Sequence, residues 1–248
     1  MMVNRNELLE NEAIRIMNAS EENKIPLRLL GGMAIYISSP CTRTEPYCRE
    51  IYDLDFVVSK KKSYLLEKLL NKIGFTGDRE FNSIHGEYRL LFHSELVELD
   101  IFVGEFVQCH SMNLEKYIGN TKLTIPLANL LLTKLQVVQI NQKDILDILA
   151  LMHDHEVEVD GDPNEVISLK ELNLILCDDW GWYTTCMDNL EKIQHFIQES
   201  FKDPDQKLLT EKIDLIRSHA QSSKKSFKWT VRSKVGRKVQ WYELPEEK

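Results

Sequence analysis

Three aspartates in two apolar segments are the residues of this chain whose types and spacing could do chemistry. Asp53 and Asp55 flank Leu54 within 51–58, a run whose composition predicts a strand. Because side chains alternate along a strand, both carboxylates should leave one face, about 7 Å apart along the backbone. Two such carboxylates repel each other unless a cation lies between them. A divalent-metal site is therefore one interpretation, and solvated charge at a sheet edge is the other.

Asp100 lies between apolar neighbours in a second predicted strand, 96–103, and should be buried. A buried carboxylate needs a partner. A metal shared with the first two aspartates would supply one, and hydrogen bonds from the backbone or from Arg89 are the alternative. Glu98 lies on the same side of the strand by parity and is a substitute ligand.

Gly31 and Gly32 follow a predicted strand at 26–30 and precede an apolar segment, 33–37, that begins a helix. Glycines at a helix N-terminus allow close backbone approach and present amide donors to triphosphate oxygens. The chain has no GxxxxGK[ST] and no GxGxxG pattern. A Walker loop and a dinucleotide fingerprint are thus excluded.

The elements around these residues predict an α+β fold. Helical spacing at 6–18 and 64–73 and strands at 87–92 and 96–103 predict a mixed sheet flanked by helices over 1–125. A helical domain follows at 126–222, and alternating residues in the basic tail, 223–248, predict a terminal β-hairpin. The predicted helices of the second domain are 127–140, 144–152, 166–177, 184–200 and 206–218.

In this order, the strand-Gly-Gly-helix, the Asp-x-Asp strand and the later strand aspartate resemble the DNA polymerase β-like nucleotidyltransferase superfamily. The sequence is most similar to its AbiEii-like group, which also has an arginine ahead of an Asp-x-Asp-Phe pattern and a downstream helical signature. The matching residues here are Arg49, Asp53-Leu54-Asp55-Phe56, Lys134-Leu135 and Lys143-Asp144-Ile145-Leu146-Asp147.

The resemblance implies a magnesium-dependent transferase that moves a nucleoside monophosphate from a nucleoside triphosphate to a hydroxyl. Two Mg²⁺ ions would be held by the three aspartates, with Asp100 on the side of the attacking hydroxyl, whose proton it could accept. Arg49 would order the loop or the carboxylates. The implied metal and catalytic residues are Asp53, Asp55 and Asp100, and the implied nucleotide-binding residues are Gly31, Gly32, Lys134 and Asp144, with Asp144 orienting Lys134 or the nucleotide.

The acceptor stays open among RNA, protein and small molecules. The AbiEii-like pattern implies a toxin of a toxin–antitoxin pair that acts on tRNA and has an antitoxin protein as partner. Small-molecule nucleotidylation of the antibiotic-modifying type is an alternative. A catalytically silent nucleotide- or RNA-binding protein of the same fold is another.

Charge is spread unevenly along the chain. Residues 223–248 hold eight Lys or Arg against three Glu, a net +5, which leaves −13 for the rest of a chain whose total is −8. This tail could follow an RNA backbone with Trp229 or Trp241 stacking on bases, or it could dock on the acidic body.

The apolar runs are too short to cross a bilayer and the N-terminus lacks an apolar signal region, so we expect a cytoplasmic protein with no membrane partner. Five cysteines without a CxxC pair predict reduced thiols, with structural roles for Cys41 and Cys48. We interpret His153-Asp154-His155-Glu156 as a polar helix end, because HxH on a helix does not face one point.

Overall fold

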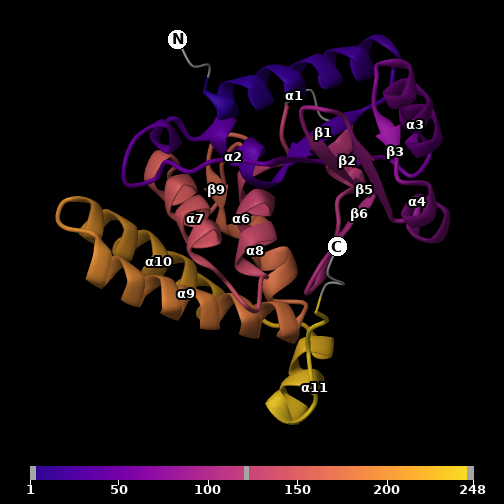
Figure 1. Ribbon diagram of the computed structural model, residues 1–248. Helices are drawn as coiled ribbons and strands as arrows, with labels where there is room; N and C mark the ends of the chain where they lie inside the picture. The colour runs from indigo at the N-terminus through magenta and orange to yellow at the C-terminus, as the bar shows by residue number, and fades with distance from the viewer. Residues whose placement is uncertain (1–3, 120–122, 245–248) are drawn as a thin grey trace. The chain divides into compact units, whose positions relative to one another are not determined.

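The computed structural model describes residues 4–119 and 123–244 and divides the chain into two compact units (Figure 1). The first unit comprises Met1–Pro40, Cys48–Val107 and Ser111–Ile125, and the second comprises Cys41–Tyr47, Gln108–His110 and Pro126–Lys248. Glu246, Glu247 and Lys248 of the basic tail lie outside the described residues. Among the helices that are described, none is long and apolar enough to cross a bilayer.

The first unit is built on a five-stranded mixed sheet. Its strands are β1 (Leu27–Leu30), β2 (Asp53–Val58), β3 (Thr76–Gly77), β4 (Arg89–His93) and β5 (Glu98–Val103). They lie in the order β1-β2-β5-β4-β3, and only β2 and β5 run parallel. The two predicted aspartate strands are therefore neighbours, as Figure 1 shows.

The two faces of β2 differ in a way that holds its register. Leu54, Phe56 and Val58 point to one side and are completely buried. On the other side Asp53 is exposed and Asp55 is half-buried. Burying each apolar side chain contributes about 1.5–3 kcal/mol. A shift of one residue would exchange the faces, so the apolar side chains also determine where the two carboxylates point.

Helices flank this sheet, and those predicted over 6–18 and 64–73 are confirmed with slightly different bounds. The first begins after Asn4, whose side chain accepts a hydrogen bond from the amide of Asn6 at 3.1 Å. A small hairpin follows the sheet. These elements are α1 (Arg5–Glu22), α2 (Gly31–Ser38), α3 (Ser63–Lys72), α4 (Arg79–His85), β6 (Glu105–Val107), β7 (Ser111–Asn113) and α5 (Glu115–Ile118).

The second unit is helical, as predicted, apart from one short parallel strand pair. Its elements are η1 (Pro40–Arg43), most of which lies in this unit, α6 (Leu127–Leu135), α7 (Gln142–Asp154), β8 (Val157–Glu158), β9 (Ile167–Ser168), α8 (Leu169–Leu176), α9 (Trp180–Ser200) and α10 (Asp205–Ser222). Side-chain oxygens of Asn141, Ser168 and Asp179 cap α7, α8 and α9. The helix predicted over 127–140 is shorter, because Asn141 starts a new helix.

The predicted terminal β-hairpin is wrong. The segment forms a helix, α11 (Phe227–Val235), followed by a short 3₁₀ helix, η2 (Gly236–Lys238). Ser226 caps α11 by accepting a hydrogen bond from the amide of Trp229 at 3.1 Å. Gly236 ends the helix with a φ of 59°, which glycine adopts readily.

The alternation of apolar residues in this segment does not mark a strand face. Phe227 is 84% exposed. Trp229 instead packs edge-on against Tyr183 of α9, with 5.3 Å between ring centroids. Residues two apart point in different directions on a helix. The alternating apolar residues therefore do not form one buried face.

Candidate active site

The parallel register of β2 and β5 brings the three predicted aspartates together. Asp55 is the register partner of Asp100, and Asp53 is the partner of Glu98. Register partners on neighbouring strands point to the same face. The four carboxylates therefore form two adjacent pairs on one face of the sheet, and Glu98 is exposed beside Asp53.

Asp100 is the buried member of this group, with 3% of its surface exposed. Arg89 on β4 donates to both of its oxygens, from Nε to Oδ1 at 2.8 Å and from Nη2 to Oδ2 at 2.5 Å. The pKa of Arg89 is raised, mainly by the hydrogen bond to Asp100, and the negative charge of Asp55 raises it further. The sequence had offered Arg89 as an alternative to a metal as the partner of Asp100, and this hydrogen-bonded pair is present.

This ion pair by itself does not use the whole hydrogen-bonding capacity of the Asp100 carboxylate. A carboxylate has about four lone-pair positions, and a bidentate arginine uses two of them. The rings of Phe102 and Phe81 lie 5.4 Å and 5.8 Å from the guanidinium carbon of Arg89 and help to fix it. Arg89 therefore holds Asp100 in one orientation.

Gly31 lies directly against Asp55. A β-carbon on Gly31 would come within 1.8 Å of Oδ2 of Asp55, and Gly31 has a φ of 64°. Both facts require glycine. The N-cap of α2 is Leu30, whose own side chain makes no capping hydrogen bond to the first amides of this helix. The positive end of a helix therefore begins beside the carboxylates.

Arg49 lies against the second glycine. A β-carbon on Gly32 would be 2.2 Å from Nη2 of Arg49. Asn6 of α1 holds the backbone of this loop, because its Nδ2 donates to the carbonyl of Arg49 at 2.7 Å and its Oδ1 accepts from the amide of Ile51 at 3.0 Å. Asn6 was missed by the sequence analysis, and no local pattern marks it.

Lys134 and Asp144 come together inside the second unit. Nζ of Lys134 lies 3.2 Å from Oδ1 of Asp144 and 2.9 Å from Oδ2 of Asp147. Both carboxylates are buried on α7. The sequence suggested that Asp144 orients Lys134 or the nucleotide, and Asp144 contacts Lys134. It assigned no role to Asp147, although a spacing of three residues places Asp147 on the same helix face as Asp144.

Many positive charges of the basic tail are used within the second unit. Arg237 binds both oxygens of Asp188 at 2.8 Å and 2.6 Å. Lys228 lies 3.8 Å and 3.6 Å from carboxylate oxygens of Asp178 and Asp179, at the start of α9. These contacts favour docking of the tail on acidic residues. The exposed basic side chains of the described tail are those of Lys224, Lys228, Lys234, Arg237 and Lys238.

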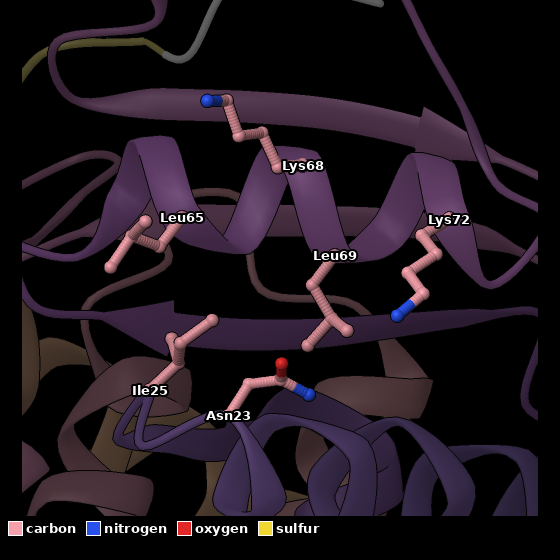
Figure 2. Close-up of a pocket in the computed structure, with 6 residues that line it drawn as sticks. All are labelled: Asn23, Ile25, Leu65, Lys68, Leu69 and Lys72. Carbon is pink, nitrogen blue, oxygen red and sulfur yellow. The ribbon is translucent and has the colours of Figure 1, made fainter.

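A shallow hollow of about 200 Å³ lies between α3 and the turn that follows α1 (Figure 2). It is lined by the apolar side chains of Ile25, Leu65 and Leu69 and by the polar residues Asn23, Lys68 and Lys72, and in Figure 2 Leu69 and Lys72 point from α3 toward Asn23. None of the predicted site residues lines it. We therefore do not assign it to the nucleotide.

The solved structures that are similar to this chain share little sequence identity with it. No curated protein matches the sequence. The crystal structure of ANT(2")-Ia in complex with adenylyl-2"-tobramycin has a TM-score of 0.43 and 14% identity, over 59% of this chain and 88% of that chain. A solution structure of the antibiotic-resistance factor ANT(2'')-Ia has a TM-score of 0.45 and 12% identity, over 78% and 99%. An antigenic nucleotidyltransferase-like protein from Paracoccidioides brasiliensis has a TM-score of 0.42 and 14% identity, over 90% and 94%.

A family model described as "Uncharacterised nucleotidyltransferase" matches residues 1–150, which is more than half of the chain. The matched segment contains the carboxylate strands β2 and β5 and the glycine pair at the start of α2. The chain therefore belongs to this family of nucleotidyltransferases.

Proposed function

We propose that the protein transfers a nucleoside monophosphate from a nucleoside triphosphate to a hydroxyl acceptor, in a magnesium-dependent reaction. The observation that carries this proposal is the pairing of Asp55 on β2 with Asp100 on β5, beside Gly31 at the start of α2. At this point the carboxylates lie beside the first backbone amides of a helix. Carboxylates bind a divalent cation and helix amides bind phosphate oxygens, so the arrangement suits a cation and a polyphosphate together.

The donor set fits magnesium. Asp53, Asp55 and Asp100 offer only oxygen atoms, which Mg²⁺ prefers, and the first two are accessible to solvent. Glu98 lies next to Asp53 and could replace a ligand. When bound, magnesium neutralises charge on the phosphates and lowers the pKa of a coordinated hydroxyl.

The glycine pair and Arg49 bind the triphosphate in this proposal. The first amides of α2 donate hydrogen bonds to phosphate oxygens, and the missing side chain of Gly31 lets those oxygens come near Asp55. Arg49, held against Gly32, adds a positive charge. This gives Arg49 a more direct part than the loop-ordering role expected from the sequence.

Asp100 serves as the carboxylate on the acceptor side. Arg89 holds both of its oxygens, so its position is set before substrate arrives. Preorganisation of this kind matters, because a misplacement of about 1 Å can lower a rate about a hundredfold. Arg89 is accordingly a positioning residue.

Lys134 contacts the phosphates of the nucleotide in this proposal, and Asp144 orients it. The support is the contact at 3.2 Å between Lys134 and Asp144, which is reinforced by Asp147. A lysine held by two carboxylates has a restricted position, which fixes where its charge stands.

We further propose RNA as the acceptor class, with tRNA as the substrate of a toxin controlled by an antitoxin protein. The support is the AbiEii-like pattern around Arg49 and Lys134, and the exposed lysines of the tail. A small-molecule acceptor and a silent nucleotide-binding protein are the competing functions, and both are outcomes of the same experiment.

The test incubates the protein with each α-³²P-labelled nucleoside triphosphate and Mg²⁺. The acceptors are purified tRNA, total RNA without tRNA, or aminoglycosides as small hydroxyl compounds. Label on tRNA supports the full proposal, and label on another acceptor keeps the transferase but replaces the acceptor. Absence of transfer to any acceptor, from a protein that binds the nucleotide, contradicts the catalytic proposal.

A further inference from the structure

The second unit contains three metal-ligating side chains that the proposed transfer site does not use. Cys41, His153 and Asp154 offer ligand atoms that all lie within 4.8 Å of one another. Cys41 belongs to the short segment Cys41–Tyr47, whereas the other two residues end α7. Cys41 and Asp154 are 113 positions apart, so no local sequence pattern could have joined them.

Hydrogen bonds already arrange this group. The amide of Cys41 donates to Oδ2 of Asp154 at 2.8 Å, and Nδ1 of His153 lies 2.7 Å from Oδ1 of Asp154. The thiol of Cys41 lies 3.6 Å from the carbonyl of Ala150, one turn earlier on α7. The three side chains are therefore held at one place and partly accessible to solvent.

Tyr47 supplies a second and independent observation. It is 4% exposed, and its hydroxyl finds no hydrogen-bond partner in the part of the chain that the structure describes. Its ring lies 5.0 Å from that of His153. Burial first, and then the charges of Asp205, Cys41 and Asp154, raise the pKa of Tyr47. Leaving a buried hydroxyl without a hydrogen-bond partner is unfavourable, so a ligand here would gain a hydrogen bond.

We propose that Cys41, His153 and Asp154 bind one Zn²⁺ ion, with water as the fourth ligand and the Tyr47 hydroxyl hydrogen-bonded to that water. A thiolate, an imidazole and a carboxylate form a typical donor set for zinc, whereas magnesium selects oxygen alone. Tetrahedral zinc needs ligand atoms roughly 3.3–3.6 Å apart. The ligand atoms of this group lie within 4.8 Å of one another, so binding requires them to approach more closely.

Binding has a defined proton balance. The S–H bond of Cys41 breaks, a Zn–S bond forms, and the proton passes to the buffer. The ion replaces the contact between the thiol and Ala150 with a bond between the segment Cys41–Tyr47 and the end of α7. It therefore joins two parts of the second unit that are distant in sequence.

The experiment uses Co²⁺ as a spectroscopic substitute on the full chain after treatment with a chelator. A thiolate ligand gives an intense sulfur-to-cobalt charge-transfer band in the near ultraviolet, which an all-oxygen site cannot give. The variants are Cys41→Ser, His153→Gln and Tyr47→Phe, and Cys48→Ser is the matched control because Cys48 is equally accessible and is not part of the cluster. Circular dichroism of each variant checks that it is folded.

We expect one equivalent of Co²⁺ per chain with the charge-transfer band, displaced by Zn²⁺. Cys41→Ser should lose the band, His153→Gln should weaken binding at least tenfold, and Tyr47→Phe should weaken it about tenfold, as loss of an outer-shell partner does. Cys48→Ser should behave as the wild type. Absence of the band in the wild type, or its persistence in Cys41→Ser, would overturn the proposal. The result is independent of nucleotidyl transfer, because the readout requires no nucleotide.

Discussion

Gly31 and Asp55 are so close that no other residue than glycine is compatible with the present position of the carboxylate. A β-carbon at residue 31 would lie 1.8 Å from Oδ2 of Asp55. The backbone of α2 thereby determines where a candidate metal ligand on β2 stands. This contact joins the two sequence features, the glycine pair and the Asp-x-Asp strand, into one site.

Gly31→Ala should lower nucleotidyl transfer about a hundredfold. The new methyl group must displace Asp55, and a shift of about 1 Å at a reacting centre costs about this much. Steady-state kinetics with labelled nucleotide measure the change. Gly74→Ala is the matched control, because Gly74 also has a positive φ, 99°, but a β-carbon there meets nothing within 4 Å. Equal activity of the two variants would contradict the role of this contact.

Arg89→Met should destabilise the protein by about 3–5 kcal/mol, because it leaves the buried charge of Asp100 without its partner. The double variant Arg89→Met with Asp100→Leu should recover most of that stability, since no unpaired charge remains. Urea unfolding measures both.

The same double variant separates the two interpretations of Asp100. If Asp100 is a catalytic carboxylate, as proposed, the stable double variant stays inactive. If the only role of Asp100 is to pair with Arg89, the double variant should recover both stability and activity.

Lys134→Met should raise the KM for the nucleoside triphosphate at least tenfold, as expected for loss of a phosphate contact of about 1.4 kcal/mol or more. It should also lower stability, because Asp144 and Asp147 lose their shared cation. Asp147→Asn is the control. It removes one carboxylate from the cluster but keeps the lysine, so KM should stay nearly constant. A folded Lys134→Met protein with an unchanged KM would limit Lys134 to a structural role.

His110 should make stability depend on pH between about 4 and 6.5. Burial lowers the pKa of His110 to about 4, against a smaller opposing effect of Asp179. The unfolded chain therefore binds a proton that the folded chain does not, and stability is complete above about pH 6.5 and is lost as the pH falls toward 4. Allowing for solvent screening, the loss from this group between pH 7 and pH 5 is about 1–2 kcal/mol.

Urea unfolding at pH 5 and pH 7 tests this prediction. His110→Gln should reduce the difference in the free energy of unfolding between the two pH values. Its amide can still bond to Thr185, which lies 2.9 Å from Nε2 of His110. An identical pH dependence in the variant and the wild type would show that other groups cause it.

Strand parity and hydrophobic pattern predicted much of the site. They placed Asp53 and Asp55 on one face of a strand and buried Asp100, because alternation within a strand depends only on local sequence. They did not predict that Asp55 lies opposite Asp100, since parallel pairing of β2 and β5 depends on the order of the whole sheet. The support that Asn6 gives to the Arg49 loop is missing from the sequence pattern for the same reason.

The tail shows where a local pattern is ambiguous. Alternating Phe227, Trp229 and Val231 predicted a strand, but the cap from Ser226 and packing against α9 give a helix. Likewise, the residues at 153–156 were interpreted as a polar helix end, and the proximity of Cys41 to His153 and Asp154 arises only through tertiary structure. Both features depend on contacts between residues that are distant in sequence.

The most direct test of the central claim is transfer of labelled nucleotide by Asp55→Asn, which keeps the shape of the side chain and removes its charge. The assay uses the acceptor identified for the wild type and varies Mg²⁺. We predict that the variant remains folded, with nucleotidyl transfer reduced by roughly 10²–10³-fold or more. Transfer at the wild-type rate, with the wild-type dependence on Mg²⁺, would contradict the assignment of the Asp53, Asp55 and Asp100 group as the active site.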